Sequence, residues 1–202
     1  MEQQTGSAAT STAAFEQRRA EIVELAAQLF DANGYAQTNM ISIARAASLR
    51  KASLYHYFRS KAEILVYIHR AHTEALFADL EKASVPGTAP EQRLRSVTHA
   101  IVHRMRYHKH SVRVFFEHDR ELPPDAAREI KALRRRYRMA VIGIIEDGIR
   151  EGSIRPIDPY YATMAVFGVT NWVYQWFEGD PGHNPDKLGA ILWDFVWHGL
   201  RS

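Results

Sequence analysis

Residues 48–65, SLRKASLYHYFRSKAEIL, place positive charges on both sides of a cluster of aromatic rings. The cations are Arg50, Lys51, Arg59 and Lys61, and the rings belong to Tyr55, His56, Tyr57 and Phe58. A core helix avoids charges, and a fully solvated helix avoids aromatic rings. Residues 15–61 hold seven Lys and Arg against four Asp and Glu, although the net charge of the whole chain is only +3. This balance predicts an anionic partner for the N-terminal quarter, with nucleic acid favoured over a membrane surface.

Ten histidines raise the question of a metal site. His99 and His103 stand at i, i+4, and His69 and His72 at i, i+3, so each pair shares one face of a helix. The chain has no cysteine, and neither face carries an acid at ligand spacing. We therefore expect no metal, and interpret these imidazoles as pocket-lining or exposed. Neither a nucleophile elbow nor a phosphate-binding loop is present, so we expect no enzyme and no cofactor.

Composition places the chain among ordinary globular proteins, with 46% hydrophobic and 24% charged residues over 202 positions. No apolar run approaches the roughly 18 residues that a membrane span needs, and residues 1–14 lack the basic and apolar regions of a signal peptide. These features predict a cytoplasmic protein that does not enter a membrane.

Hydrophobic spacing divides the first third of the chain into short helices. Residues 1–14 are small and polar and predict a disordered tail. A helix pattern begins at Phe15 and ends at Gly34, and Thr38 can cap a second short helix. A third helix, over about residues 50–58, would turn Leu54 and Phe58 inward.

The same spacing predicts helices throughout the remainder. Ser60 and Glu63 can form a capping box that starts a long helix reaching about residue 82. Further helices are expected over about residues 90–107, 111–120, 124–151, 158–177 and 185–200. No alternating strand pattern occurs, so the fold class is all-α. The helix at 158–177 is apolar on nearly every face and should be covered on both sides.

Residues 22–65, IVELAAQLFDANGYAQTNMISIARAASLRKASLYHYFRSKAEIL, resemble the DNA-binding domain of the tetracycline-repressor-like (TetR) family of transcriptional regulators. The resemblance implies a helix-turn-helix whose last helix enters the major groove of double-stranded DNA. Ser48-Leu49-Arg50 stands where the family usually has Gly-Val-Ser, so the permissive glycine and the small cap are both missing. The expected DNA contacts are Thr38, Asn39, Arg50, Lys51, Ser53, Tyr55, His56, Tyr57 and Lys61, with Lys61, Thr38 and Asn39 at phosphates.

The resemblance also implies a DNA-binding domain at 15–61 and a helical ligand-binding and dimerisation domain at 62–202. FGVTNWVYQWFEGD and NPDKLGAILWDFVWHGL resemble a subgroup of these regulators, several of which sense acyl-CoA thioesters. The expected ligand-binding residues are His103, Arg106, Phe115, Phe116, Tyr137, Arg138, Val141 and Trp172. The expected contacts of a homodimer are Phe167, Trp193, Phe195 and Trp197.

The function that this resemblance implies is a homodimeric, ligand-responsive transcriptional regulator, most often a repressor. It would bind a palindromic operator and be released by a small hydrophobic or acyl-CoA-type ligand. The alternative is an all-α carrier or enzyme with a vestigial helix-turn-helix. A cation sensor is a second alternative for the ligand. Arg134 and Arg138 fit a solvated helix face, a second nucleic-acid patch or a cationic cavity mouth.

Overall fold

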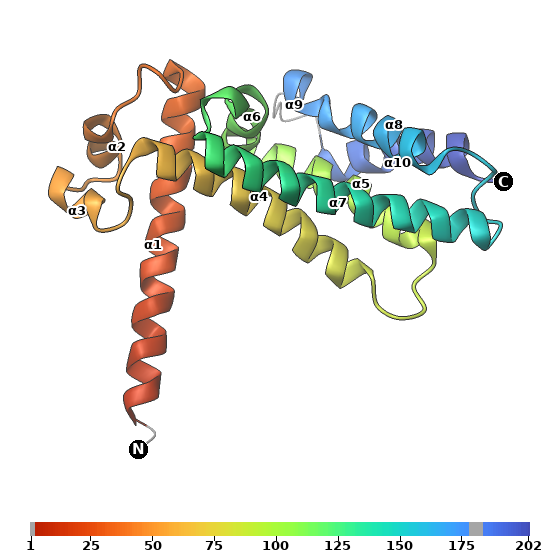
Figure 1. Cartoon of the computed structure of the whole chain (residues 1–202), viewed down its shortest axis with the longest axis horizontal. Coiled ribbons are helices and arrows are strands. Elements are labelled where there is room, and N and C mark those ends of the chain that lie inside the picture. Colours follow the sequence, from red (N-terminus) through yellow and green to blue (C-terminus); the bar gives the residue numbers. More distant parts are fainter. Residues whose placement is uncertain (1–2, 178–183) are drawn as a thin grey trace.

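The computed structural model of the protein describes residues 3–177 and 184–202, with side chains from residue 12 onward. Within these residues every regular element is helical, and the all-α prediction is confirmed (Figure 1). The helices are α1 (Gln3–Asn33), α2 (Met40–Ala46), α3 (Lys51–Tyr55), α4 (Lys61–Ala83), α5 (Pro90–Tyr107), α6 (Lys109–Glu117), α7 (Pro124–Arg150), α8 (Pro159–Asn171), α9 (Val173–Trp176) and α10 (Pro185–Leu200), with a 3-10 turn, η1 (Asp119–Glu121), before α7. No described helix is long and apolar enough to cross a membrane.

Helices α1 to α3 form a small N-terminal head at one end of the molecule (Figure 1). Its core includes the fully buried side chains of Ile22, Phe30, Ile43, Leu54 and Phe58. The inward orientation predicted for Leu54 and Phe58 is confirmed. The division of the chain into domains at residues 61 and 62 remains a prediction.

Helix α1 starts at Gln3, so residues 3–14 are helical where the sequence predicted a disordered tail. Figure 1 shows this part of α1 projecting away from the rest of the chain. The described side chains from Thr12 to Gln17 are exposed, although the ring of Phe15 stacks on Tyr57. Alanine has the highest helix propensity of all residues, and Ala13 and Ala14 continue directly into the packed part of α1.

Helices α4 to α10 form a C-terminal bundle around a second core, which includes Leu94, Val141, Ile145 and Val173. Helix α4 belongs to both cores. Its first half contributes Ile64, Leu65 and Ile68 to the head, and its second half contributes Leu76 and Leu80 to the bundle. A displacement of α4 by anything bound in the bundle would therefore reach the head, because close-packed cores transmit strain.

The segment predicted as one helix at 158–177 consists of α8 and α9, which meet at Trp172. The hydroxyl of Thr170 donates to the carbonyl of Val166 at 2.8 Å, a bond that often bends helices. The prediction that both sides of this segment are covered is wrong for the single chain. Tyr161 is 70% exposed and Val169 42% exposed.

Candidate functional site

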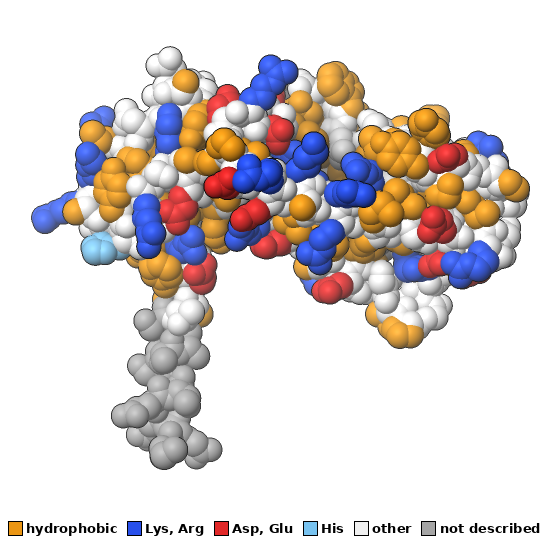
Figure 2. All heavy atoms as spheres, in the orientation of Figure 1, with side chains coloured by type: hydrophobic (Ala, Val, Ile, Leu, Met, Phe, Trp, Pro, Cys, Tyr) orange, Lys and Arg blue, Asp and Glu red, His pale blue; other side chains and the backbone are white. Residues whose placement is uncertain are grey.

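The end of the head formed by α2 and α3 carries positive charge and no acidic residue. Between Asp31 and Glu63 the chain has no acidic residue, although the stretch contains Arg45, Arg50, Lys51, Arg59 and Lys61. All of these except Lys61 are exposed. Lys and Arg side chains stand out at the end of the molecule formed by α2 and α3 (Figure 2). Such a surface attracts a polyanion.

The turn before α3 has a left-handed backbone conformation at a residue that is not glycine. Ser48 has φ of 54°, in the left-handed region that glycine occupies without steric strain. Arg50 is the N-cap of α3 in an extended conformation, and its side chain makes no capping hydrogen bond. The turn ends α2 and leaves Lys51, Tyr55 and His56 on the outer side of α3, all exposed.

Two polar side chains hold α2 in place from within. Thr38 is 2% exposed, and its hydroxyl lies 3.1 Å from the carbonyl oxygen of Leu29 and 3.0 Å from that of Gly34. The Lys61 ammonium donates to the carbonyls of Tyr35, Ala36 and Thr38 at 2.8, 3.3 and 3.0 Å. These three bonds match the three donors of an ammonium group, so Lys61 fixes the turn between α1 and α2.

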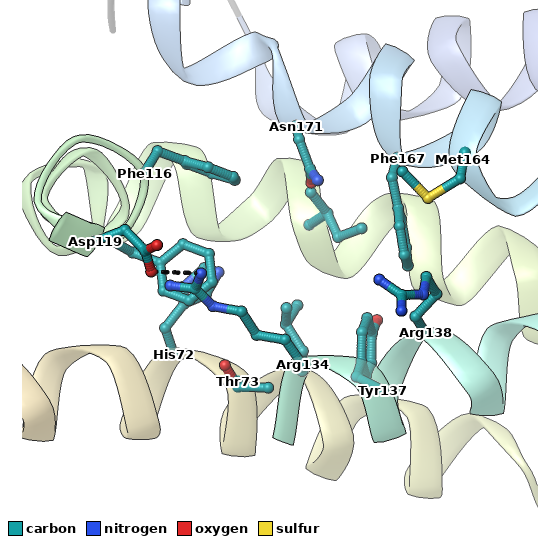
Figure 3. Close-up of a pocket in the computed structure, with 13 residues that line it drawn as sticks. His72, Thr73, Phe116, Asp119, Arg134, Tyr137, Arg138, Met164, Phe167 and Asn171 are labelled. Carbon is teal, nitrogen blue, oxygen red and sulfur yellow. Dashed lines mark hydrogen bonds and ion pairs between the residues drawn. The ribbon is translucent and has the colours of Figure 1, made fainter. Parts of the chain in front are cut away.

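The C-terminal bundle contains a cavity of about 310 Å³ between α4, α6, α7 and α8 (Figure 3). This volume lies at the lower end of the range for small-molecule sites. Most of the lining is aromatic or aliphatic. The lining residues are His72, Thr73, Leu76, Ile101, Phe115, Phe116, Asp119, Arg134, Tyr137, Arg138, Met164, Phe167 and Asn171.

Arg134 pairs two of its three guanidinium nitrogens at one end of the cavity. Its Nη1 lies 2.7 Å from Oδ1 of Asp119 (Figure 3). Its Nη2 lies 2.7 Å from Nδ1 of His69, its guanidinium lies over the ring of Phe115, and its Nε is buried without a partner among the described residues. Arg138 and Tyr137 differ. The Nε of Arg138 and the hydroxyl of Tyr137 are buried without a hydrogen-bond partner among the described residues.

Burial determines the protonation of the groups around the cavity. Burial lowers the pKa of His69 to about 4, and the nearby Arg134 adds to this effect. Burial also holds the pKa of His72 well below its ordinary value, with Arg104 as the next cause. Burial raises the pKa of the Tyr137 hydroxyl, with a further contribution from Asp79. At neutral pH both imidazoles are therefore uncharged, and Tyr137 is a hydrogen-bond donor.

Helix α6 and the turn η1 connect the cavity to the head. Phe115 and Phe116 of α6 line the cavity, and His110 of the same helix lies 2.7 Å from the Asp31 carboxylate in α1. Directly before η1, the ring of His118 packs against the ring of Tyr35 with centroids 6.2 Å apart. Tyr35 is also one of the residues whose carbonyl holds Lys61.

An apolar face remains uncovered on the opposite side of α8 from the cavity. It lies between α8 and α10, where Tyr161, Ala165, Val169 and Phe195 line a groove. Phe195 is 71% exposed. Figure 2 shows apolar side chains gathered over α8. Apolar patches of this kind on a protein surface usually mark an interface.

Comparison with known proteins assigns both parts of the chain to one family. Residues 22–68 match the family described as "Bacterial regulatory proteins, tetR family", and residues 87–200 match "Tetracyclin repressor-like, C-terminal domain". This chain belongs to the TetR family. It is a DNA-binding transcriptional regulator, and the family is one of regulators rather than of enzymes.

Individual TetR relatives cover almost the whole chain. The HTH-type transcriptional repressor KstR2 of Mycolicibacterium smegmatis is 25% identical over 92% of this chain and 91% of its own. The structure of the ketosteroid transcriptional regulator KstR2 of Mycobacterium tuberculosis superposes with a TM-score of 0.84 at 24% identity, over 92% of this chain and 95% of that one. The TetR regulator PfmR of Thermus thermophilus has a TM-score of 0.81 at 31% identity, over 90% of this chain and 99% of that one.

The side chains expected to contact DNA differ in exposure. Arg50, Lys51, Tyr55 and His56 are exposed at the tip of the head, and Ser53 is half-buried. These remain predicted contacts.

The remaining expected contacts have structural roles. Tyr57 is half-buried and stacks on Phe15 of α1, with ring centroids 5.0 Å apart. Asn39, not Thr38, caps α2, and its Oδ1 accepts from the backbone of Ile41 and Ser42. The hydroxyl of Thr38 faces inward, so its expected phosphate contact is wrong for the side chain. Whether Lys61 also reaches a phosphate remains a prediction.

One further helix cap differs from its expectation. The Ser60 hydroxyl accepts from the backbone N–H of Glu63 as predicted, but the Glu63 carboxylate accepts from the N–H of Arg59 and not from that of Ser60. The second hydrogen bond of the capping box therefore goes to the residue before the N-cap of α4 instead of to the N-cap itself.

Four of the expected ligand-binding residues line the cavity, namely Phe115, Phe116, Tyr137 and Arg138. The other four do not. Val141 is fully buried in the bundle core, Trp172 is 62% exposed, and His103 and Arg106 are exposed on α5. Residues that the expectation missed include His72, Asp119 and Asn171. They come from three different elements, and the sequence does not show how these elements are rotated relative to one another.

The four residues expected at the dimer interface also lie in different places, some exposed and some in the core of the bundle. Phe195 lies on the uncovered face, but Trp193 is only 8% exposed and belongs to the bundle core, where it stacks on Trp197 with centroids 5.3 Å apart. Phe167 stacks on Tyr137 and lines the cavity. The burial of Trp193 does not fit the expected interface, and Trp197 is half-buried against the same core. The dimer contacts of Phe167 and Phe195 remain predictions.

Proposed function

We propose that this regulator is a homodimeric repressor that binds a palindromic operator and is released when a small apolar ligand enters the cavity. The observation that carries the proposal is the acid-free surface of α2 and α3, which presents Lys51, Tyr55 and His56 to solvent. A helix with exposed donors and rings, flanked by cations, suits the major groove and its phosphate edges. The relatives named as transcriptional repressors support repression rather than activation.

A second copy of the chain would pack on the groove between α8 and α10. This face combines Phe195 and Tyr161, the two most exposed large apolar side chains among the described residues, with Val169, which is 42% exposed. Two such faces around a twofold axis would form a four-helix interface. Dimerisation then sets the spacing of the two α3 helices to one turn of DNA.

Ligand binding would act on the head through two connections. Helix α4 contributes to both cores, so a ligand that moves its cavity half tilts its first turn. The Arg134–Asp119 pair holds η1, beside which His118 packs on Tyr35. A ligand that favours a different position of Arg134 would shift the population away from the DNA-competent arrangement.

The test is fluorescence anisotropy with the DNA upstream of the protein's own gene, compared with scrambled DNA of equal length. His56→Ala should reduce the preference for the upstream DNA, and Lys51→Ala should weaken both DNAs and lower the salt slope by about one per protomer. The matched controls are His103→Ala and Lys82→Ala, exposed residues on α5 and α4 outside the head. Equal affinity of the unaltered protein for upstream and scrambled DNA would favour the alternative, a carrier with a vestigial head.

A further inference from the structure

Besides the Nε of Arg134, whose other two guanidinium nitrogens are paired, the cavity contains two hydrogen-bond donors that nothing in the described chain satisfies. Tyr137 is 5% exposed, and its hydroxyl has no partner. The Nε of Arg138 is buried and also without a partner, and the described residues offer Arg138 no ion pair. Both side chains project from α7 toward Phe167 and Met164 of α8 (Figure 3). Buried polar groups in proteins are almost always paired, so two orphan donors in one cavity indicate a missing acceptor.

The charges around the cavity favour an anion as that acceptor. Three charged side chains line it: Arg134, Arg138 and Asp119. Asp119 and Arg134 neutralise each other at 2.7 Å, and His72 is uncharged at neutral pH. One positive charge, that of the half-buried Arg138, has no ion-pair partner among the described residues, and its guanidinium lies 5.9 Å from the centre of the Tyr160 ring. A guanidinium beside a hydroxyl donor fits the two oxygens of a carboxylate.

The size of the cavity limits the rest of the ligand. A volume of about 310 Å³ corresponds to about ten to fifteen closely packed non-hydrogen atoms, given about 30 Å³ for each molecule of liquid water. The body of the ligand would lie among Leu76, Phe116 and Phe167, which offer no charge and little hydrogen bonding. The nucleotide part of a coenzyme A thioester is several times too large for this space and would have to lie outside it.

We infer that the cavity binds a free carboxylic acid of medium length in its ionised form, with the carboxylate on Arg138 and the Tyr137 hydroxyl and an apolar chain between α4 and α8. The inference rests on the proposed function in one respect, since it names the ligand of the same cavity. It differs from an acyl-CoA ligand in the head group, because the free acid presents a carboxylate where the thioester has a neutral carbonyl.

The first experiment compares four ligands of equal chain length by isothermal titration calorimetry with the full-length protein and no DNA. The ligands are octanoate, 1-octanol, octylamine and octanoyl-coenzyme A. Octanoate should bind at least about 10-fold more tightly than the other three, the factor expected for a charge-assisted hydrogen bond. Tighter binding of octanoyl-coenzyme A, octylamine or octanol, or no binding of octanoate, would overturn the inference.

The second experiment locates the carboxylate. Arg138→Ala should weaken octanoate about 10- to 100-fold and leave octanol unchanged, whereas Tyr137→Phe should weaken octanoate about 2- to 10-fold. Arg135→Ala, at an exposed position on the same helix, is the matched control and should bind octanoate normally. Equal losses for octanoate and octanol in Arg138→Ala would show that the arginine only shapes the cavity, and would overturn the inference.

These binding measurements separate the two proposals. If octanoate binds but does not release the upstream DNA, the ligand class stands and ligand-controlled release fails. If another ligand releases the DNA and octanoate does not bind, the regulator stands and the carboxylate inference fails.

Discussion

Replacing Tyr137 by phenylalanine should make the ligand-free protein more stable, which is an unusual expectation for a core residue. The substitution removes one oxygen and retains the ring, which packs edge-on against Phe77 and stacks on Phe167. The hydroxyl is buried and has no partner among the described residues. An unsatisfied buried polar group costs about 1–3 kcal/mol. Tyr137→Phe should therefore raise the free energy of unfolding by about 1 kcal/mol or more.

The assay is urea and thermal unfolding followed by circular dichroism at one fixed protomer concentration, because dimerisation makes the melting temperature concentration-dependent. For a chain of this length, 1 kcal/mol corresponds to a shift in Tm of about 2–4 °C. Tyr107→Phe is the control, since Tyr107 is 60% exposed and its hydroxyl should not matter. A loss of stability of 1 kcal/mol or more in Tyr137→Phe would show that the hydroxyl has a partner in the folded protein, and would refute the reasoning.

Three further results are expected. Phe195→Glu should give a folded monomer in analytical ultracentrifugation because it puts a charge into the proposed interface. Trp193→Glu should instead unfold the protein, because Trp193 is 8% exposed in the bundle core. A folded Trp193→Glu monomer would contradict this assignment. The pKa of His69 is about 4 in the folded protein, below its ordinary 6.5, so its stabilising contribution is complete above pH 6.5 and should decrease by up to about 3 kcal/mol on acidification toward pH 4. His69→Asn, whose amide oxygen can still accept from Arg134, should show a flatter dependence of urea unfolding on pH; an unchanged dependence would exclude His69 as its source. Lys61→Ala should lower the free energy of unfolding by about 1–3 kcal/mol, since three carbonyls lose their donor; unchanged stability with a smaller salt slope for DNA would instead assign Lys61 to a phosphate.

The sequence predicted the helices well where one face was apolar and a proline marked the first turn, as in α7 and α10. The prediction for 124–151 agrees with α7, which ends at Arg150, and that for 185–200 agrees with α10. The predicted helix boundaries were wrong where helix propensity or a side-chain hydrogen bond mattered more than the spacing of apolar residues. The alanine-rich start of α1 is helical although its small polar residues predicted disorder, and the Thr170 hydroxyl lies at the break between α8 and α9.

Within the head, helical spacing and the motif order of residues 22–65 predicted the inward side chains Leu54 and Phe58 and the exposed Arg50 and His56. They did not predict that Tyr57 is half-buried against Phe15. The substitution of Ser48 for glycine was also visible in the sequence, and its φ of 54° confirms that the turn needs a left-handed residue. The inward bonds of Thr38 and Lys61 were not visible, because each reaches a backbone carbonyl that no side-chain pattern marks.

In the bundle, only the tertiary structure decided between core, cavity and exposed face. Helices α8 and α10 are apolar on more than one side, so periodicity cannot say which side packs within the chain. Trp193 and Phe195 are both large and apolar, yet one is 8% and the other 71% exposed. The rotation of each helix about its axis follows from the packing of all its neighbours at once, and that collective fit also leaves the Tyr137 hydroxyl and the Arg138 Nε unpaired in the same cavity.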